Sequence, residues 1–216
     1  MINKFREPVS GLTHLFGAVA SIFGMVSLIK YEATIPSATP LAFLAVTMFG
    51  LSLILLYTAS TVYHLIKSSD KVIKTLRKLD HSMIYILIAG TYTPICLISL
   101  HGYLRWGMFI GIWSSALLGI AFKMIWFNAP RWLSTLFYIL LGWLAVFIVS
   151  PLSKAMAVQG LVYLFLGGIF YTIGALIYAT KWPKFKSKLF GFHEIFHLFV
   201  LAGSFCHYFM VFRYVL

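Results

Sequence analysis

Seven long apolar segments, separated by short polar connections, are the feature that most limits what this chain can fold into. An α-helix needs about 20 apolar residues to cross roughly 30 Å of hydrocarbon, at about 1.5 Å per residue. Segments close to that length cover residues 12–29, 41–63, 82–100, 106–126, 132–149, 158–179 and 192–212. The sequence therefore predicts an all-α, polytopic membrane protein, a seven-helix transmembrane bundle that occupies residues 1–216 as a single domain.

The composition excludes a water-soluble protein, because 61% of the residues are hydrophobic and 10% are charged, against about 25% charged in soluble domains. The net charge of +12 would suggest nucleic acid in a soluble domain. In a membrane chain, however, a basic excess reflects topology and the anionic cytoplasmic leaflet. We therefore predict membrane lipids as partners and no nucleic acid. Both cysteines, Cys96 and Cys206, lie in apolar segments, which excludes a disulfide framework.

The distribution of basic residues predicts the orientation of the bundle. Thirteen of the 17 Lys and Arg residues fall on the side of the N-terminus and four on the other side. The thirteen are Lys4, Arg6, Lys67, Lys71, Lys74, Arg77, Lys78, Lys123, Arg131, Lys181, Lys184, Lys186 and Lys188, and the four are Lys30, Arg105, Lys154 and Arg213. By the positive-inside rule, the N-terminus is cytoplasmic and the C-terminus lies outside.

Ionisable side chains gather where the second predicted helix ends and the third and seventh begin. A central Asp, Lys or Arg costs about 2.5 to 3.5 kcal/mol on insertion scales, so such residues need a partner or a function. His64 ends the second helix, Asp80 opens the third, and His193 and His197 open the seventh, with Ser60 one turn before His64. Residues spaced i, i+4 share a helix face. Three neighbouring helices can therefore bring three imidazoles, a carboxylate and a hydroxyl to one point at the cytoplasmic face.

Three imidazoles with an open fourth position form the ligand set of a catalytic Zn²⁺, and a carboxylate and a hydroxyl can hold or deprotonate its bound water. The sequence thus predicts a zinc site with Asp80 and Ser60 beside it. A single intramembrane histidine such as His14 is more often a hydrogen-bonded packing residue. His207 lies roughly 20 Å deeper than His193, so we interpret it as a hydrogen-bonding residue of the bundle interior or as a residue that lines a cavity. His81 is expected to face the lipid headgroups.

The string HEIFH, residues 193–197, also fits the H-E-x-x-H pattern of zinc metalloproteases, in which the Glu is the general base. Glu194 at a helix start can equally serve as a partner of the helix dipole or as a solvated residue. The metalloprotease interpretation leaves Ser60 and Asp80 unexplained. Both interpretations of Glu194 stay open at the level of the sequence.

Four strings, in this order, resemble the hemolysin III branch of the progestin and adipoQ receptor (PAQR) family. They are EPVSGLTH at 7–14, STVYH at 60–64, LDHS at 79–82 and HEIFHLFVLAGS at 193–204. The resemblance implies seven membrane helices, an inside N-terminus, and zinc held by His64, His193 and His197 with Asp80 and Ser60 near the bound water. Related receptors carry Gln in place of Glu194, which weakens the metalloprotease interpretation. Many bacterial relatives carry Asn in place of Ser10, so the first-helix motif is assigned no role.

The wider superfamily includes alkaline ceramidases, so the resemblance implies a zinc-dependent hydrolase of lipid amides or esters, with the lipid chain admitted to the bundle and a role in membrane homeostasis. The alternative is a non-enzymatic receptor or sensor of the membrane state with a structural zinc. A pore-forming haemolysin needs a polar stripe along several helices, which the sequence lacks. The short termini resemble a bacterial member, which implies the inner membrane.

Overall fold

A computed structural model of the chain describes residues 5–184 and 190–216. The described residues contain seven helical spans that are long and apolar enough to cross a membrane, which confirms the predicted all-α, multi-pass fold. Along the chain they are α1 (Pro8–Glu32), α2 (Pro40–Leu65), α3 (Asp70–Pro94) with the π-helical turn η2 (Ile95–Ser99), α4 (Gly102–Ile125), α5 (Arg131–Gly142) with the 3₁₀ segment η3 (Trp143–Ile148) and α6 (Val149–Ala155), α7 (Val158–Thr180), and α8 (Phe192–Met210) with the π-helical turn η4 (Val211–Val215).

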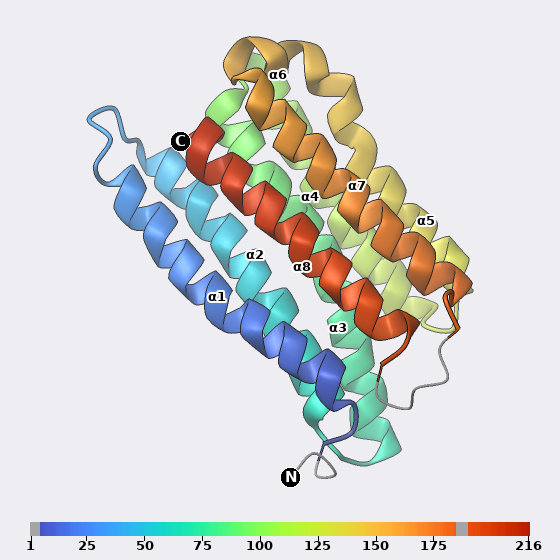
Figure 1. Cartoon of the computed structure of the whole chain (residues 1–216). Helices are drawn as coiled ribbons and strands as arrows, with labels where there is room; N and C mark the ends of the chain where they lie inside the picture. The colour runs from blue at the N-terminus through green and yellow to red at the C-terminus, as the bar shows by residue number, and fades with distance from the viewer. Residues whose placement is uncertain (1–4, 185–189) are drawn as a thin grey trace.

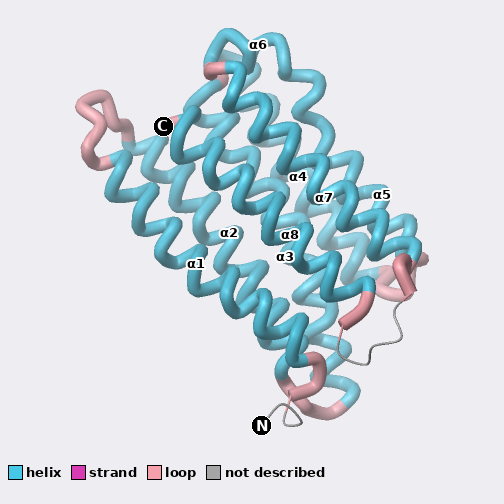
Figure 2. Tube along the Cα trace, in the orientation of Figure 1, coloured by secondary structure: helices cyan, strands magenta, loops and turns pink. Residues whose placement is uncertain are grey.

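The helices close into a bundle around α3, the span with the largest buried share of its apolar window, 72%. Helix α1 packs on α2, α2 on α3, α3 on α4 and α7 on α8, while α8 returns to contact α1 (Figure 1). The start of α1 and the end of η4 lie at opposite ends of the bundle, and the described loops lie at these two ends (Figure 2). We call the end at which α1, α3, α5 and α8 begin the N-terminal end.

The outer surface of the bundle is apolar. Large side chains on several helices point outward and are exposed, among them Phe16, Phe23, Leu118 and Phe147. Such a surface suits hydrocarbon as the surrounding solvent, since helices satisfy their backbone hydrogen bonds internally.

Helix α3 begins at Asp70, well before the predicted start at residue 82. The first three turns carry several lysines as well as apolar Val72, Ile73 and Leu76. Lys and Leu are good helix formers, so the helix extends past the apolar segment that hydropathy detects. Asp80 therefore lies inside the helix rather than at its first turn.

The fifth span is interrupted by a 3₁₀ segment, which the hydropathy pattern does not predict. Pro151 lacks an N–H and clashes with the carbonyl one turn earlier, which disfavours a regular α-helix through η3. The Tyr92 hydroxyl donates to the carbonyl of Gly142 at 2.6 Å and accepts from the N–H of Ala145 at 2.7 Å. Tyr92 thus satisfies backbone groups that the interruption frees inside the apolar region.

Candidate metal centre

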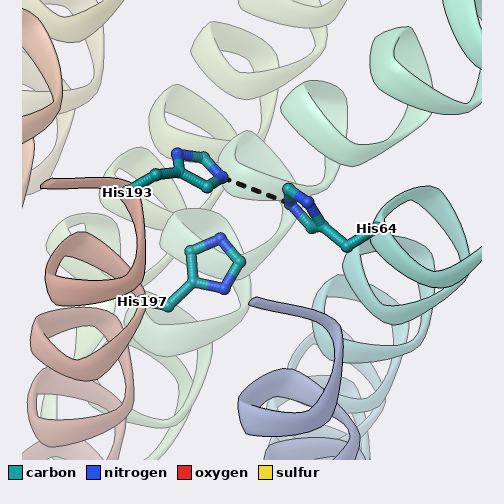
Figure 3. A group of neighbouring side chains, drawn as sticks. All are labelled: His64, His193 and His197. Carbon is teal, nitrogen blue, oxygen red and sulfur yellow. Dashed lines mark hydrogen bonds between the residues drawn. The ribbon is translucent and has the colours of Figure 1, made fainter. Parts of the chain in front are cut away.

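Three imidazoles from two helices meet near the N-terminal end of the bundle. His64 lies on the last turn of α2, and His193 and His197 lie one turn apart at the start of α8. Their side chains point toward one another across the gap between the helices (Figure 3). His64 and His197 are fully buried, and His193 is partly buried. The structure therefore brings together the three histidines that the sequence proposed as metal ligands.

The spacing of the ring nitrogens suits a tetrahedral cation. One ligand nitrogen from each ring lies within 4.8 Å of the others, and the Nε2 atoms of His64 and His193 are 3.3 Å apart. Zn–N bonds of about 2.0 to 2.1 Å at tetrahedral angles place nitrogens about 3.3 Å apart. The three residues could thus hold a metal ion.

Hydrogen bonds from the start of α1 fix the tautomers of two of these rings. The Nδ1 atom of His64 bonds to the Glu7 carboxylate, and the Nδ1 atom of His197 lies 3.2 Å from the Ser10 carbonyl oxygen. Both oxygens only accept, so each Nδ1 carries the proton. Each ring then has its Nε2 left for the shared point. Hydrogen bonds to Nδ1 of this kind orient a histidine so that its Nε2 can bind a metal.

Glu7 connects the site to the segment before α1. Its backbone N–H donates to the His64 carbonyl at 2.9 Å, and Arg6 stacks over the Tyr63 ring at 4.1 Å. Partial burial would raise the pKa of Glu7, but the hydrogen bond and charge of His64, together with the charges of Arg6 and His193, hold that pKa below its ordinary value. Glu7 is therefore a carboxylate near neutral pH, as its role toward His64 requires.

Asp80 and Ser60 lie beside the imidazole cluster. Both line the same cavity as His193 and His197, and the Ser60 hydroxyl is within hydrogen-bonding reach of the Asp80 carboxylate. Ser60 is buried, and Asp80 is partly buried. A carboxylate and a hydroxyl thus line the cavity that two of the three imidazoles also line.

His14 differs from the sequence-based expectation. It is buried, but neither of its ring nitrogens has a hydrogen-bond partner among the described residues, so the prediction of a hydrogen-bonded packing residue is wrong. Its ring stacks on His197, with centroids 3.7 Å apart and planes 11° from parallel, and it lines the cavity. An imidazole with free nitrogens is therefore available to a bound molecule there.

Glu194 acts as a helix cap. Its carboxylate accepts from the Gly191 N–H at 2.8 Å and from the Ser10 hydroxyl at 2.6 Å. The carboxylate is directed toward α1 and the first turn of α8, and the three-histidine group does not include it. This geometry favours the dipole-partner interpretation over a general base.

The cavity next to the histidines has a volume of about 460 Å³ and extends into the middle of the bundle. His14, Asp80 and His193 line one end, and His207 lines the other, where its Nε2 bonds to the Leu164 carbonyl at 3.1 Å. His81 also lines the cavity, near the rings of Phe127 and Tyr178, so the expectation that it faces headgroups is wrong.

Glu7 and Ser10 are residues of the site that could not be assigned from the sequence. Both lie in the EPVSGLTH string, and their chemistry is visible only once α1 packs against α2 and α8. The signal available in the sequence was position: an acidic residue immediately before the first helix, at the end of the bundle that carries the histidines.

Comparison with known proteins places these residues in a family. The sequence matches the family described as haemolysin-III related over residues 2–208. It is 41% identical to Hemolysin-3 of Bacillus cereus over 211 residues, 98% of this chain and 92% of that protein. It is 40% identical to the Hemolysin-3 homolog of Bacillus subtilis (strain 168) over 214 residues, 99% of this chain and 96% of that protein. It is also 25% identical to the human monocyte to macrophage differentiation factor over 176 residues, 78% of this chain and 69% of that protein. This distant match supports the wider superfamily.

Proposed function

Because this chain belongs to the haemolysin-III related family and presents three convergent imidazoles, we propose that it is a zinc-dependent membrane hydrolase that cleaves amides or esters of lipids. His64, His193 and His197 are the proposed ligands. Asp80 and Ser60 are the proposed catalytic residues. The proposed location is the bacterial inner membrane, with the metal centre near the cytoplasmic face.

The observation that carries the proposal is the convergence of three imidazoles on one point. The Glu7 carboxylate and the Ser10 carbonyl bond to the Nδ1 atoms of His64 and His197, which leaves the Nε2 atoms of both rings for that point. The His64 Nε2 lies 3.3 Å from the His193 Nε2, a separation that suits two ligands of one tetrahedral cation. A divalent cation satisfies all three rings at once.

Zinc, if bound by the three histidines, would supply a water molecule whose pKa is about 7. Asp80 lines the same cavity as His193 and His197, and its carboxylate is the proposed general base that would accept a proton there. The Ser60 hydroxyl donates its one proton to the Asp80 carboxylate and so orients this proposed general base. Both residues have a role that a purely structural metal site does not require.

The apolar part of the cavity is the proposed seat of the lipid chain. Its walls beyond the histidines include Ile88, Ile95, Leu164 and Val200. A volume of about 460 Å³ is within the range of about 300 to 1,000 Å³ typical of small-molecule pockets. A pocket of this size beside three convergent imidazoles favours a hydrolase over a pore.

Asp80→Asn is the substitution that tests this function. We expect the purified variant to keep its zinc and to lose turnover by at least about 100-fold on a panel of lipid amides and esters, because the proton acceptor is gone. Asp70→Asn, which alters an exposed acidic residue at the same end, should keep both zinc and turnover. A wild-type protein that holds zinc but turns over no lipid of the panel would instead support a structural metal in a sensor.

A further inference from the structure

Three basic residues converge on the cavity on the side away from α1. Arg77 on α3, Lys123 on α4 and Arg131 at the start of α5 all line it. The charged groups of Arg77 and Lys123 lie 5.3 and 5.4 Å from the Phe127 ring, and that of Arg131 lies 5.3 Å from the Tyr178 ring. We call Arg77, Lys123 and Arg131 the cationic triad.

No carboxylate forms an ion pair with the triad, although all five acidic residues of the chain lie in the described ranges 5–184 and 190–216. Within these ranges, the ion pairs run from Glu7 to Arg6 and His64. Asp80 interacts electrostatically with Arg77. However, the Asp80 carboxylate already accepts a hydrogen bond from Ser60 and interacts with His64. The triad therefore carries an excess of positive charge into the cavity.

The burial of Lys123 makes this excess costly. Its side chain is 4% exposed, and its ammonium donates to the Ser134 hydroxyl at 3.1 Å, a neutral partner. A buried ammonium without a counter-charge is strongly unfavourable. The positive-inside rule explains the sign of charges in loops and not the burial of one of them inside a bundle.

Helix dipoles do not account for the triad either. Lys123 lies in the last turn of α4, where a cation is favourable, but Arg131 is the first residue of α5, where the dipole opposes a cation. The first turn of α5 has no acidic residue and no side-chain cap. The Arg131 side chain and the positive end of the α5 dipole thus lie together at the start of α5. An anion bound there would neutralise both.

We propose that the cationic triad binds the anionic headgroup, a phosphate or a carboxylate, of an amphiphile whose chain occupies the apolar part of the cavity. Two guanidinium forks, an ammonium and the nearby Tyr178 hydroxyl offer the donors that a tetrahedral phosphate requires. The inference deepens the proposed function by naming acidic lipids as the substrate class, and it rests on that function for any reaction. Binding itself needs neither metal nor turnover.

Binding of oleoyl lysophosphatidic acid to the purified, chelator-treated protein tests the proposal, with monooleoylglycerol as the uncharged analogue and inorganic phosphate as the chain-free one. We expect the acid to bind at least about tenfold more tightly than the glycerol. Arg77→Gln and Arg131→Gln should each lower the affinity for lysophosphatidic acid by about tenfold and leave the affinity for monooleoylglycerol unchanged. Lys74→Gln, which alters an exposed lysine on the same helix as Arg77, should change neither affinity. Equal affinities for the two lipids, or an unchanged affinity in both arginine variants, would overturn the proposal.

Two further arms complete the experiment. Inorganic phosphate should compete only at far higher concentration than the lipid. Competition at equal concentration would assign the triad to a free anion and overturn its assignment to a lipid.

Lys123→Met should lower the affinity for lysophosphatidic acid. The ligand-free variant should melt at or above the wild-type temperature, because an apolar side chain is easier to bury. A large fall in melting temperature with unchanged affinity would make Lys123 a folding residue and remove it from the triad. Because chelated protein is used, failure of zinc-dependent turnover would not affect this result.

Discussion

At the scale of single residues, the site depends on groups outside the ligand set. Glu7 directly precedes α1 and Ser10 lies in its first turn, yet each fixes one ring of a histidine on another helix. Second-sphere partners of this kind set the tautomer and orientation of a ligand and raise its basicity. Metal affinity should therefore depend on α1 although α1 supplies no ligand.

Glu7→Gln tests this dependence. We predict a loss of zinc affinity of about 10- to 100-fold, measured by competition with a chelator, because the amide no longer holds the His64 proton as a charged acceptor does. Asp70→Asn removes an exposed carboxylate at the same end and should leave the affinity unchanged. Equal affinities in wild type and Glu7→Gln would show that Glu7 does not position the ligand.

At the scale of elements, close helix packing brings the site residues together. Gly90 on α3 faces α2 so closely that an added Cβ atom would clash with the Cβ of Ser52. This contact lies between the two helices that carry His64 and Asp80. In contrast, a Cβ atom added at Gly107 on α4 would meet open space, with no neighbouring atom of the described residues within 4 Å.

We predict that Gly90→Ala destabilises the protein by about 1 to 3 kcal/mol, because α2 and α3 must separate to admit the methyl group. Gly107→Ala should be neutral or stabilise by about 0.5 to 1 kcal/mol, since alanine favours a helix. Thermal unfolding of both variants in one detergent makes the comparison. A Gly90→Ala protein as stable as wild type would contradict the close approach of the two helices.

The sequence predicted the elements that hydrophobicity controls and missed those that backbone details control. All seven spans were predicted, because a run of apolar residues is sufficient to identify each one. The interruption after Gly142 was missed, since it depends on Pro151 together with Tyr92 from another helix. The early start of α3 was missed because Lys and Asp extend a helix without extending its apolar segment.

At the scale of the whole molecule, the convergence of the histidines was predictable because antiparallel helices place the end of α2 beside the starts of α3 and α8. Their common depth in the bundle also predicted Asp80 and Ser60 beside them. Depth could not predict His14 stacked on His197, or the cationic triad, because both depend on rotation of each helix about its own axis.

The orientation of the bundle in the membrane is a prediction that fusions can test. With the basic N-terminal end in the cytoplasm, alkaline phosphatase fused after Leu216 should be exported and active. The same enzyme inserted after Ser69, in the connection between α2 and α3, should be inactive. The reverse pattern would place the metal centre on the outer side and contradict the predicted topology.

Metal analysis of detergent-purified protein tests the central claim most directly. We predict about one zinc ion per wild-type chain and less than roughly a tenth of that in His64→Ala, because two imidazoles cannot retain the ion. His101→Ala, which removes an exposed histidine elsewhere, should keep the full amount. A wild-type protein without any divalent metal, or equal zinc in wild type and His64→Ala, would contradict a metal centre at His64, His193 and His197.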